Sequence, residues 1–344
     1  MVAMKRWLPV ATVGLLLAGC ASAATENGLR LGYLGNLTHA TAIVGVANGL
    51  LAKSLGDTRL TTQVFNAGPA EMTALLGGQL DAAYVGPSSA LNGYVRSHGQ
   101  ALKIIAGATM GGAELVVRSS IDSVAQLKGK TLATPQLGNT QDVALRYWLS
   151  QHDLKTSTDG SGDVAIRPQD NATTLDQFRA GKIDGAWLPE PWASRLVVEA
   201  QAKVLVDERD LWPDGRFAST DLVVSTKFLR EHPETVRRLI AGELATNDWI
   251  SNSAVQAAKT VNTELQRLSG AKLTDEEIAR AWGQQQVTDD PLASTVGVQA
   301  DHAVTVGLMS AIDLRGIVDV GPLNEALTAA GKQKVDDAGL GAKQ

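Results

Sequence analysis

A short polar turn between an apolar strand and an apolar helix is the part of this sequence best suited to binding an anion. It is Leu137-Gly138-Asn139-Thr140-Gln141-Asp142, between the apolar residues 131–133 and a helical pattern over 143–149. The first N–H groups of such a helix lack intrahelical partners and lie at the positive end of its dipole, so the turn can hold an anion without Lys or Arg. An ordinary helix start, with Asn139 or Thr140 as N-cap and Asp142 in the first turn, fits the same residues.

Comparable turns follow other predicted strands along the chain. Their hydroxyls, amides and helix N-termini would surround a sulfonate or carboxylate with neutral donors, and none of these turns contains Lys or Arg. The candidate ligand-binding residues are Asn36, Thr38, His39, Asn66, Gly68, Gly86, Ser88 and Ser89, followed later in the chain by Asn139, Thr140, Gln141, Trp187, Glu190 and Trp192.

Several of these candidates have structural explanations as well. Ser88 and Ser89 fit a helix cap as well as a ligand contact. His39 fits a partly exposed residue of a first helical turn, and Asn66 and Asn139 fit the backbone conformations of turns. These alternatives stay open at the level of sequence.

Two tryptophans flank the rigid segment Pro189-Glu190-Pro191. Either Trp187 or Trp192 could form a wall of a ligand cleft, or both could belong to the core. Glu190 could receive the ammonium group of a taurine-like zwitterion, or it could cap the next helix.

The N-terminus has the pattern of a secretory signal. Lys5 and Arg6 precede an apolar stretch over residues 7–17, and Leu17-Ala18-Gly19-Cys20 closes it. This ending resembles a bacterial lipobox, which implies cleavage before Cys20 and lipidation of that cysteine. Residues 1–20 are thus expected to be a lipoprotein signal peptide and 21–28 a linker; plain secretion with cleavage inside 21–24 is the alternative.

Composition excludes several classes of function. Without Lys5 and Arg6, 29 of the 31 basic residues remain against 36 acidic ones, a formal charge of −7, so we expect no nucleic-acid binding. Cys20 is the only cysteine, which excludes disulfides and cysteine-containing zinc motifs. No later apolar run is long enough to span a membrane. We expect no cofactor and no metal.

The elements that would position these turns form a repeat. Leu34-Gly35-Asn36 recurs as Leu137-Gly138-Asn139, and residues 78–85 recur as 181–188, both at an offset of 103. Short apolar runs alternate with helical patterns, which is typical of α/β architecture. A repeat this long indicates two similar lobes, whose strand ends would face a common cleft.

We therefore expect a two-lobed α/β protein. Residues 29–112 begin lobe 1, residues 113–221 form lobe 2, and residues 222–344 return to lobe 1 and continue as C-terminal helices, with helical patterns only after residue 225. Two extended runs, over 113–118 and 217–225, are the expected crossovers. The later helices are expected at 226–230, 233–251, 254–268, 274–286, 298–312 and 323–330.

Several motifs, in their order and spacing, resemble the substrate-binding proteins of ABC importers in the sulfonate, taurine and nitrate family. They are Gly86-Pro87-Ser88-Ser89-Ala90-Leu91-Asn92, Ile104-Ile105-Ala106-Gly107-Ala108-Thr109, Gly138-Asn139-Thr140 and Trp187-Leu188-Pro189-Glu190-Pro191-Trp192-Ala193. The resemblance implies a type II periplasmic-binding-protein fold with two hinge strands. It also implies a monomer that closes over an anionic or zwitterionic solute, an aliphatic sulfonate or taurine above all, and delivers it to a permease.

Enzymes and sensors are the alternative classes of function for this sequence. Desulfinases and thiamine-pyrimidine synthases resemble this fold, but the former use a cysteine nucleophile and the latter a cysteine-rich segment, and the sole cysteine here is assigned to the anchor. A ligand-binding sensor lipoprotein is a further alternative. Nitrate or an aromatic acid could replace the sulfonate as ligand.

Overall fold

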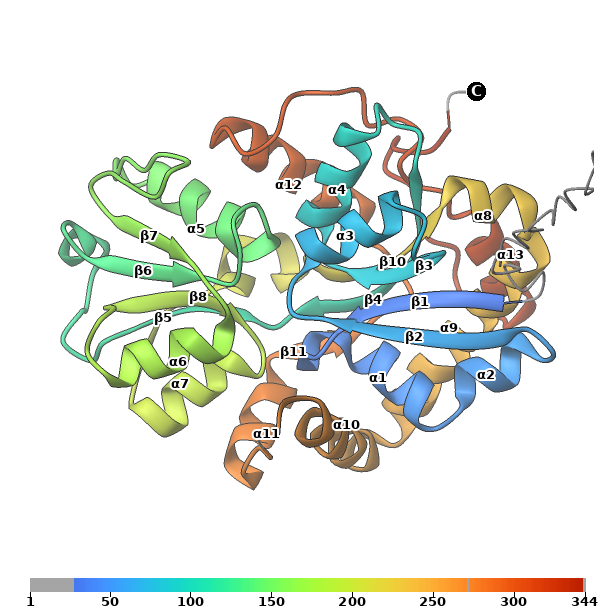
Figure 1. The fold of residues 1–344 in the computed structure, drawn as a ribbon, viewed down its shortest axis with the longest axis horizontal. Helices are drawn as coiled ribbons and strands as arrows, with labels where there is room; N and C mark the ends of the chain where they lie inside the picture. The colour runs from blue at the N-terminus through green and yellow to red at the C-terminus, as the bar shows by residue number, and fades with distance from the viewer. Residues whose placement is uncertain (1–27, 271, 343–344) are drawn as a thin grey trace, which may run out of the picture.

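The computed structural model describes residues 28–270 and 272–342. The predicted signal peptide, Cys20 and most of the predicted linker lie outside these residues. The described chain forms two lobes, each built on one β-sheet (Figure 1). None of the helices in the described ranges is long and apolar enough to cross a membrane.

The sheet of lobe 1 has six strands in the order β11-β4-β10-β3-β1-β2. β1 runs parallel to β2 and β3, whereas β10 runs antiparallel to both of its neighbours and β11 antiparallel to β4. Most of the central strands are continuously buried, as strands covered on both faces must be. The strands are β1 (Gly28–Leu34), β2 (Arg59–Phe65), β3 (Ala82–Val85), β4 (Leu102–Gly111), β10 (Ala218–Ser225) and β11 (Gln285–Val287).

The sheet of lobe 2 repeats this arrangement with five strands in the order β7-β6-β8-β5-β9. β6 is parallel to β7 and β8, and β5 is antiparallel to β8 and β9. β10 of lobe 1 and β5 of lobe 2, each antiparallel to both of its neighbours, adjoin the crossovers between the lobes. The strands are β5 (Ala113–Val117), β6 (Thr131–Thr134), β7 (Ala165–Pro168), β8 (Gly185–Pro189) and β9 (Lys203–Asp207).

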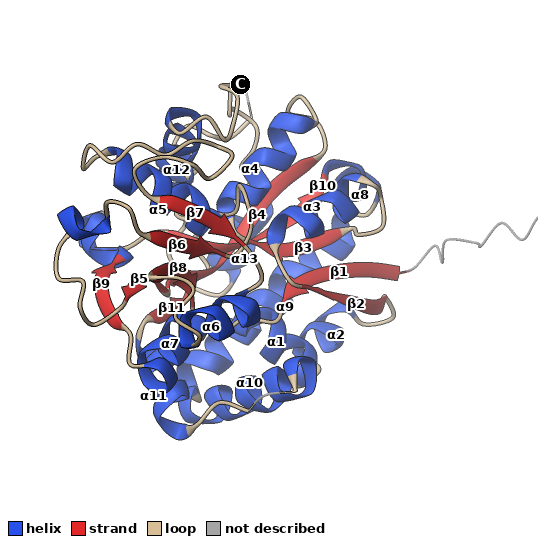
Figure 2. Ribbon diagram, turned by 60° about the vertical axis from the view of Figure 1, so that its left-hand side comes forward, coloured by secondary structure: helices blue, strands red, loops and turns tan. Residues whose placement is uncertain are grey.

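Helices cover both faces of each sheet (Figure 2). Lobe 1 has one large apolar core, and lobe 2 has a separate core on each side of its sheet. The α-helices of lobe 1 are α1 (Ala40–Ala47), α2 (Leu50–Leu55), α3 (Gly68–Leu76), α4 (Pro87–Arg96), α8 (Thr226–Glu231), α9 (Pro233–Asn252), α10 (Ala254–Ser269), α11 (Asp275–Gly283), α12 (Ala293–Thr305) and α13 (Gly321–Ala329), and those of lobe 2 are α5 (Thr140–Ser150), α6 (Asn171–Arg179) and α7 (Trp192–Ala200). Short 3-10 helices span Leu37–His39, Val124–Leu127, Glu208–Leu211 and Pro213–Gly215.

The repeated Asp of the two lobes has the same structural role in both. Asp81 accepts a hydrogen bond from the N–H of Arg30 (2.8 Å), and Asp184 accepts one from the N–H of Thr131 (2.9 Å). Each Asp also donates its own N–H to the carbonyl of that same residue. The two Asp residues are 103 positions apart but their partners only 101, so the offset of 103 does not extend back to the first strand of each lobe. Lobe 2 therefore has two extra residues between Thr131 and Leu137, compared with the segment from Arg30 to Leu34 in lobe 1.

The return to lobe 1 also differs from our expectation. β10 pairs with β4 from Ala218 onward, four residues before the expected boundary at 221/222. The C-terminal part is not purely helical, because α11 ends at Gly283 and β11 then pairs with the edge of β4. The helix expected at 298–312 is α12, which begins at Ala293 and ends at Thr305. Pairing at a sheet edge is a long-range event that helix-forming composition does not reveal.

Candidate functional site

The turn before α5 is held in place by a buried carboxylate. Asp142 accepts hydrogen bonds from the N–H of Gly138 (2.9 Å) and the hydroxyl of Thr134 (2.8 Å), and it forms an ion pair with Arg146 (3.1 Å). Asn139 is the N-cap, since its Oδ1 accepts from the N–H of Asp142 at 2.9 Å. The turn is therefore rigid, and it presents the start of α5 to the space between the lobes.

That space is a small cavity of about 30 Å³, which can hold a few waters or a small polar group. Turns from both lobes and the crossover strand β10 enclose it, and no Lys, Arg, Asp or Glu among the described residues lines it. Its walls are Leu34, Asn36, Thr38, His39, Asn66, Ala67, Gly68, Gly86, Ser89, Pro135, Asn139, Thr140, Gln141, Pro189 and Ser219.

Thr140 brings an unsatisfied polar atom to this cavity. Its hydroxyl is buried and has no hydrogen-bond partner among the described residues. The starts of α3, α4 and α5 lie at the same cavity, so N–H groups without intrahelical partners converge there. A buried polar atom left unpaired is costly, and an anionic group in the cavity would satisfy it.

His39 adds a neutral donor. Its ring is almost completely buried, and burial lowers its pKa to about 3, so the ring carries no charge at neutral pH. Nδ1 accepts a hydrogen bond from the N–H of Leu34 (3.3 Å). The proton of the neutral ring is therefore on Nε2, which remains the donor of this side chain.

Glycines allow the turns to approach one another closely. A Cβ on Gly86, in lobe 1, would lie 2.6 Å from the Thr140 hydroxyl in lobe 2. A Cβ on Gly68 would lie 2.5 Å from the hydroxyl of Ser89. Any larger residue at Gly86 would therefore hold the two lobes apart.

The two tryptophans have different positions, and neither lines the cavity. Trp187 is completely buried in lobe 2, where its indole N–H donates to Glu208 at 2.7 Å and its ring lies edge-on to Trp148. Trp192 is partly exposed and crosses between the lobes, donating from its indole N–H to Asn36 Oδ1 at 3.0 Å. Trp187 is thus a core residue, while Trp192 acts on the site through Asn36.

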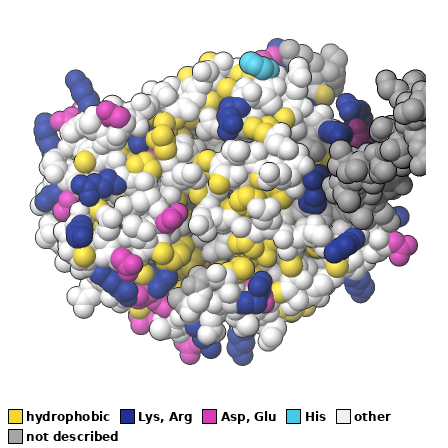
Figure 3. Space-filling model, viewed as in Figure 1, with side chains coloured by type: hydrophobic (Ala, Val, Ile, Leu, Met, Phe, Trp, Pro, Cys, Tyr) yellow, Lys and Arg dark blue, Asp and Glu magenta, His cyan; other side chains and the backbone are white. Residues whose placement is uncertain are grey.

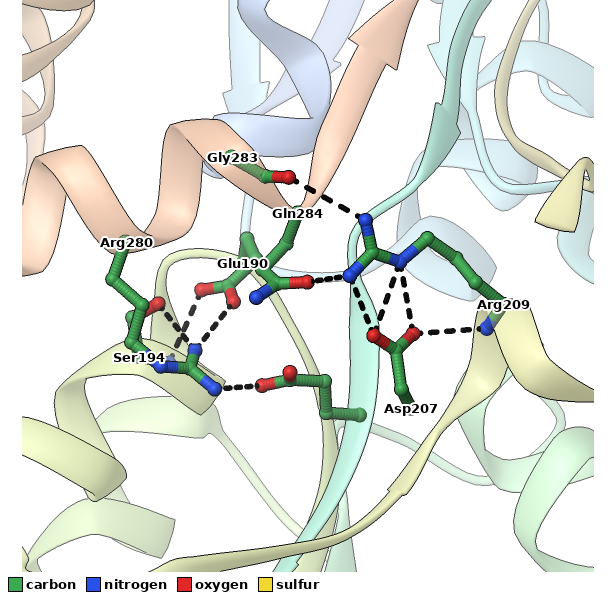
Figure 4. A network of polar contacts seen from close by, with 8 residues as sticks. Glu190, Ser194, Asp207, Arg209, Arg280, Gly283 and Gln284 are labelled. Atoms are coloured by element: carbon green, nitrogen blue, oxygen red, sulfur yellow. Dashed lines mark hydrogen bonds and ion pairs between the residues drawn. The ribbon is translucent and has the colours of Figure 1, made fainter.

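Glu190 is completely buried and is bound by other residues, so it is not available to an ammonium group (Figure 4). It accepts from the N–H of Ser194 in the first turn of α7 (3.1 Å) and from Arg280 (3.1 Å). Burial raises its pKa to about 7 and the nearby Glu114 adds to this, against the effect of Ser194 and Arg280. Of the two sequence interpretations, the capping role agrees with these contacts.

The residue that holds this cluster together is not among the candidates that the sequence offers. Arg280, on α11, donates to Glu114 (2.7 Å), to Glu190 and to the hydroxyl of Ser194 (2.7 Å), so a lobe 1 helix is bound to lobe 2. No local signal marks Arg280, because its partners lie 90 and 166 positions away.

A second arginine crosses between the lobes beside this cluster. Arg209 is held by Asp207 at the end of β9 and reaches the side chain of Gln284 and the carbonyl of Gly283 (3.4 Å) (Figure 4). The adjacent crossover is Gly111–Gly112, where both residues have positive φ (74° and 76°). The network therefore lies at the hinge, behind the cavity.

The lobes are also in contact on the opposite side of the junction. α12 packs on α5, with the rings of Tyr147 and His302 stacked 3.5 Å apart, and Asn92 donates to the carbonyl of Gly138 (3.3 Å). α11 and α12 bridge the junction on its two sides (Figure 1). The two lobes are thus in direct contact on both sides of the junction.

Ten of the fourteen candidate residues line the cavity. Ser88 is buried beside it, with an unpartnered hydroxyl, and Trp187, Glu190 and Trp192 lie elsewhere. Ser219 was missed because it lies in a crossover strand and not in a turn. The residues that line the cavity and were not expected are Leu34, Ala67, Pro135, Pro189 and Ser219.

Two similar lobes, two crossovers and a polar cavity between them define a two-lobed protein of the type II periplasmic-binding-protein fold. The chain belongs to the NMT1-like family, whose profile matches residues 22–263. It is 28% identical over 299 residues to a "Putative binding protein" of Brucella abortus (strain 2308), covering 83% of this chain and 88% of that one.

Solved structures share this fold at low sequence identity. One is the alkanesulfonate-binding protein of Xanthomonas axonopodis pv. citri bound to MOPS, with a TM-score of 0.67 and 20% identity over 83% of this chain and 95% of that one. Another is the periplasmic nitrate-binding protein of Synechocystis PCC 6803, with a TM-score of 0.71 and 14% identity over 88% and 89%. The expected fold class and family are confirmed.

Proposed function

We propose that this protein is the extracytoplasmic solute-binding component of an ABC importer and captures a small organic anion by closure of its lobes. The observation that carries the proposal is the unpartnered, buried hydroxyl of Thr140 at the start of α5, in a cavity between two lobes. A solute bound to both lobes would stabilise the closed form, which a permease could then recognise. The names of the relatives support a binding protein over an enzyme.

The residues that line the cavity support an aliphatic sulfonate as the solute over the other anions considered. Neutral donors face an anionic head group, and Leu34, Ala67, Pro135 and Pro189 offer apolar contacts to a short alkyl chain. In the part of the chain that the structure describes, no carboxylate lines the cavity to receive an ammonium group, and Glu190 is engaged by Arg280. These contacts favour a simple alkanesulfonate over taurine. No Trp, Tyr or Phe ring of the described residues lines the cavity as a slot for an aromatic acid.

Nitrate is the second candidate. The volume of about 30 Å³ is small, which favours a compact anion. The apolar wall argues for the sulfonate, because nitrate has no alkyl group to place against it.

A thermal-shift panel on residues 21–344 tests this proposal. We expect ethanesulfonate to stabilise the protein, by roughly 2.7 kcal/mol at a hundred times its dissociation constant. Taurine is the matched control, because it differs from ethanesulfonate by one ammonium group. A shift from nitrate alone would select the second candidate, and turnover of any of these anions, or no shift from all of them, would contradict transport.

Membrane attachment and oligomeric state belong to the same proposal. We propose that the mature chain is anchored through lipidated Cys20 and acts as a monomer. The lipobox-like ending of the signal supports the anchor. Metabolic labelling with a radioactive fatty acid, compared between the native chain and Cys20→Ser, tests it directly.

A further inference from the structure

A second and larger hollow lies at the other end of the lobe 1 sheet. Its volume is about 560 Å³, and it is formed by the starts of β1 and β2, the segment before β3, and the end of β10 with the following α8. We call it the basal groove. Its charged walls are Arg30, Arg59, Asp81, Lys227, Arg230 and Glu231.

The basal groove is well separated from the cavity between the lobes. β1 connects the two, since Gly28 and Arg30 line the groove whereas Leu34, at the other end of the strand, lines the cavity. Seven residues of β-strand span roughly 20 Å. A molecule bound in the groove would therefore leave the cavity free.

The groove carries an excess of positive charge in an acidic protein. Arg30 is neutralised by Asp81 (2.5 Å), and Arg230 makes only a long contact with Glu231 (3.6 Å). The side chains of Arg59 and Lys227 are exposed and form no ion pair with any described residue. Lys and Arg side chains are visible at the end of the molecule where β1 begins (Figure 3). The formal charge of the whole chain is −5.

We propose that the basal groove binds the phosphate groups of anionic phospholipids. This inference rests on the proposed lipid anchor. Eight positions separate Cys20 from Gly28, a segment that reaches at most about 28 Å when extended. The anchor thus keeps this end of lobe 1 near the bilayer, where Arg59, Lys227 and Arg230 meet lipid phosphates and the cleft points away from the membrane.

Vesicle co-sedimentation of residues 21–344 tests the proposal without the lipid anchor, and this segment contains every described element. We expect binding to vesicles with 30% phosphatidylglycerol at low salt and none to pure phosphatidylcholine. The variant Arg59→Glu/Lys227→Glu/Arg230→Glu should weaken the binding at least tenfold. High salt should abolish it, because the attraction is electrostatic.

A matched control changes the charge by the same amount elsewhere. Lys155→Glu/Arg167→Glu/Lys182→Glu alters three exposed cations of lobe 2 and should bind the vesicles less than twofold more weakly. The neutral variant Arg59→Gln/Lys227→Gln/Arg230→Gln replaces the charge-reversed one if that variant melts early. Equal vesicle binding by the groove variants and the native protein would overturn the proposal.

Inorganic phosphate is the alternative ligand of the basal groove, because it carries the same phosphate group as the lipids. Stabilisation of the native protein by inorganic phosphate, lost in the groove variant and without vesicle binding, would assign the groove to a soluble anion and overturn the lipid proposal. Ethanesulfonate binding is measured on the same variants. If it persists while vesicle binding is absent, only the lipid proposal fails.

Discussion

The indole N–H of Trp192 donates a hydrogen bond to Oδ1 of Asn36 at 3.0 Å, across the boundary between the lobes. The two residues are 156 positions apart, and Asn36 lines the cavity. Next to them the N–H of Leu37 donates to the carbonyl of Glu190 (3.1 Å). Trp192 lies outside the cavity, but its hydrogen bond links Asn36, which lines the cavity, to closure of the lobes.

Replacing Trp192 with Phe removes this hydrogen bond but keeps an aromatic ring. We expect solute affinity to fall about three- to tenfold, the effect of one hydrogen bond worth about 0.5–1.5 kcal/mol. Isothermal titration calorimetry with the solute identified in the panel measures it. Trp249→Phe, on the periphery of the lobe 1 core, is the control and should leave affinity unchanged. Equal affinities in all three proteins would show that the bond does not contribute to closure.

Replacing Thr140 with Val removes the unpartnered hydroxyl at almost constant volume. We expect affinity for an anionic solute to fall by about tenfold or more, since a hydrogen bond to a charged group contributes about 1.5–3 kcal/mol. The ligand-free variant should be at least as stable as the native protein, because no buried hydroxyl remains unpaired. Thr173→Val, exposed on α6, is the matched control. Unchanged binding by Thr140→Val would remove this residue from the site.

Replacing Arg280 with Met leaves Glu114 and Glu190 buried without their cation. We expect the free energy of unfolding at pH 8 to fall by about 3–5 kcal/mol, the usual effect of breaking a buried ion pair. The loss should be smaller at pH 5.5, where protonated carboxyls no longer need a cation. Urea unfolding at both pH values measures this. Adding Glu190→Gln should restore part of the stability at pH 8, and a loss independent of pH would point to packing instead.

Replacing Glu208 with Gln should change how stability depends on pH. Burial raises the pKa of Glu208 to about 7, from 4.5, so the folded protein keeps a proton that the unfolded chain releases at lower pH. The contribution of Glu208 to the free energy of unfolding is fully present below about pH 4.5 and is lost as the pH rises through about 7.

The difference in the free energy of unfolding between Glu208→Gln and the native protein should therefore shift in favour of the variant by up to about 3 kcal/mol between pH 5 and pH 8. The side-chain oxygen of the Gln can still accept the hydrogen bond from Trp187. Glu276→Gln, exposed at the start of α11, is the control and should show no such gain. Parallel stability curves for the native and Glu208→Gln proteins would mean that Glu208 ionises normally.

The local features of the binding turns were predictable from sequence. A strand, a polar turn and an amphipathic helix with Asn139 at its start are set by contacts within a few residues, such as the bond from the N–H of Asp142 to Asn139. The turns at Gly68 and Gly86 were likewise predictable as polar turns before helices. Both line the cavity, together with most of the other polar candidates. Repetition of these units along the chain was sufficient to predict two lobes.

The roles of Trp187, Trp192, Glu190 and Arg280 depended on tertiary structure. Strand alternation places Trp187 on one face of β8, but only packing of α5 over that face makes it core. From sequence, Glu190 could either cap a helix or contact a ligand. Its contact with Arg280 of α11, 90 positions away, is visible only in the tertiary structure. Local sequence specifies the hydrogen bonds that a turn makes with itself. The packing of the two lobes and of a distant helix decides which side chains meet across the hinge. Burial and charge pairing are properties of the assembled chain, so local sequence does not specify them.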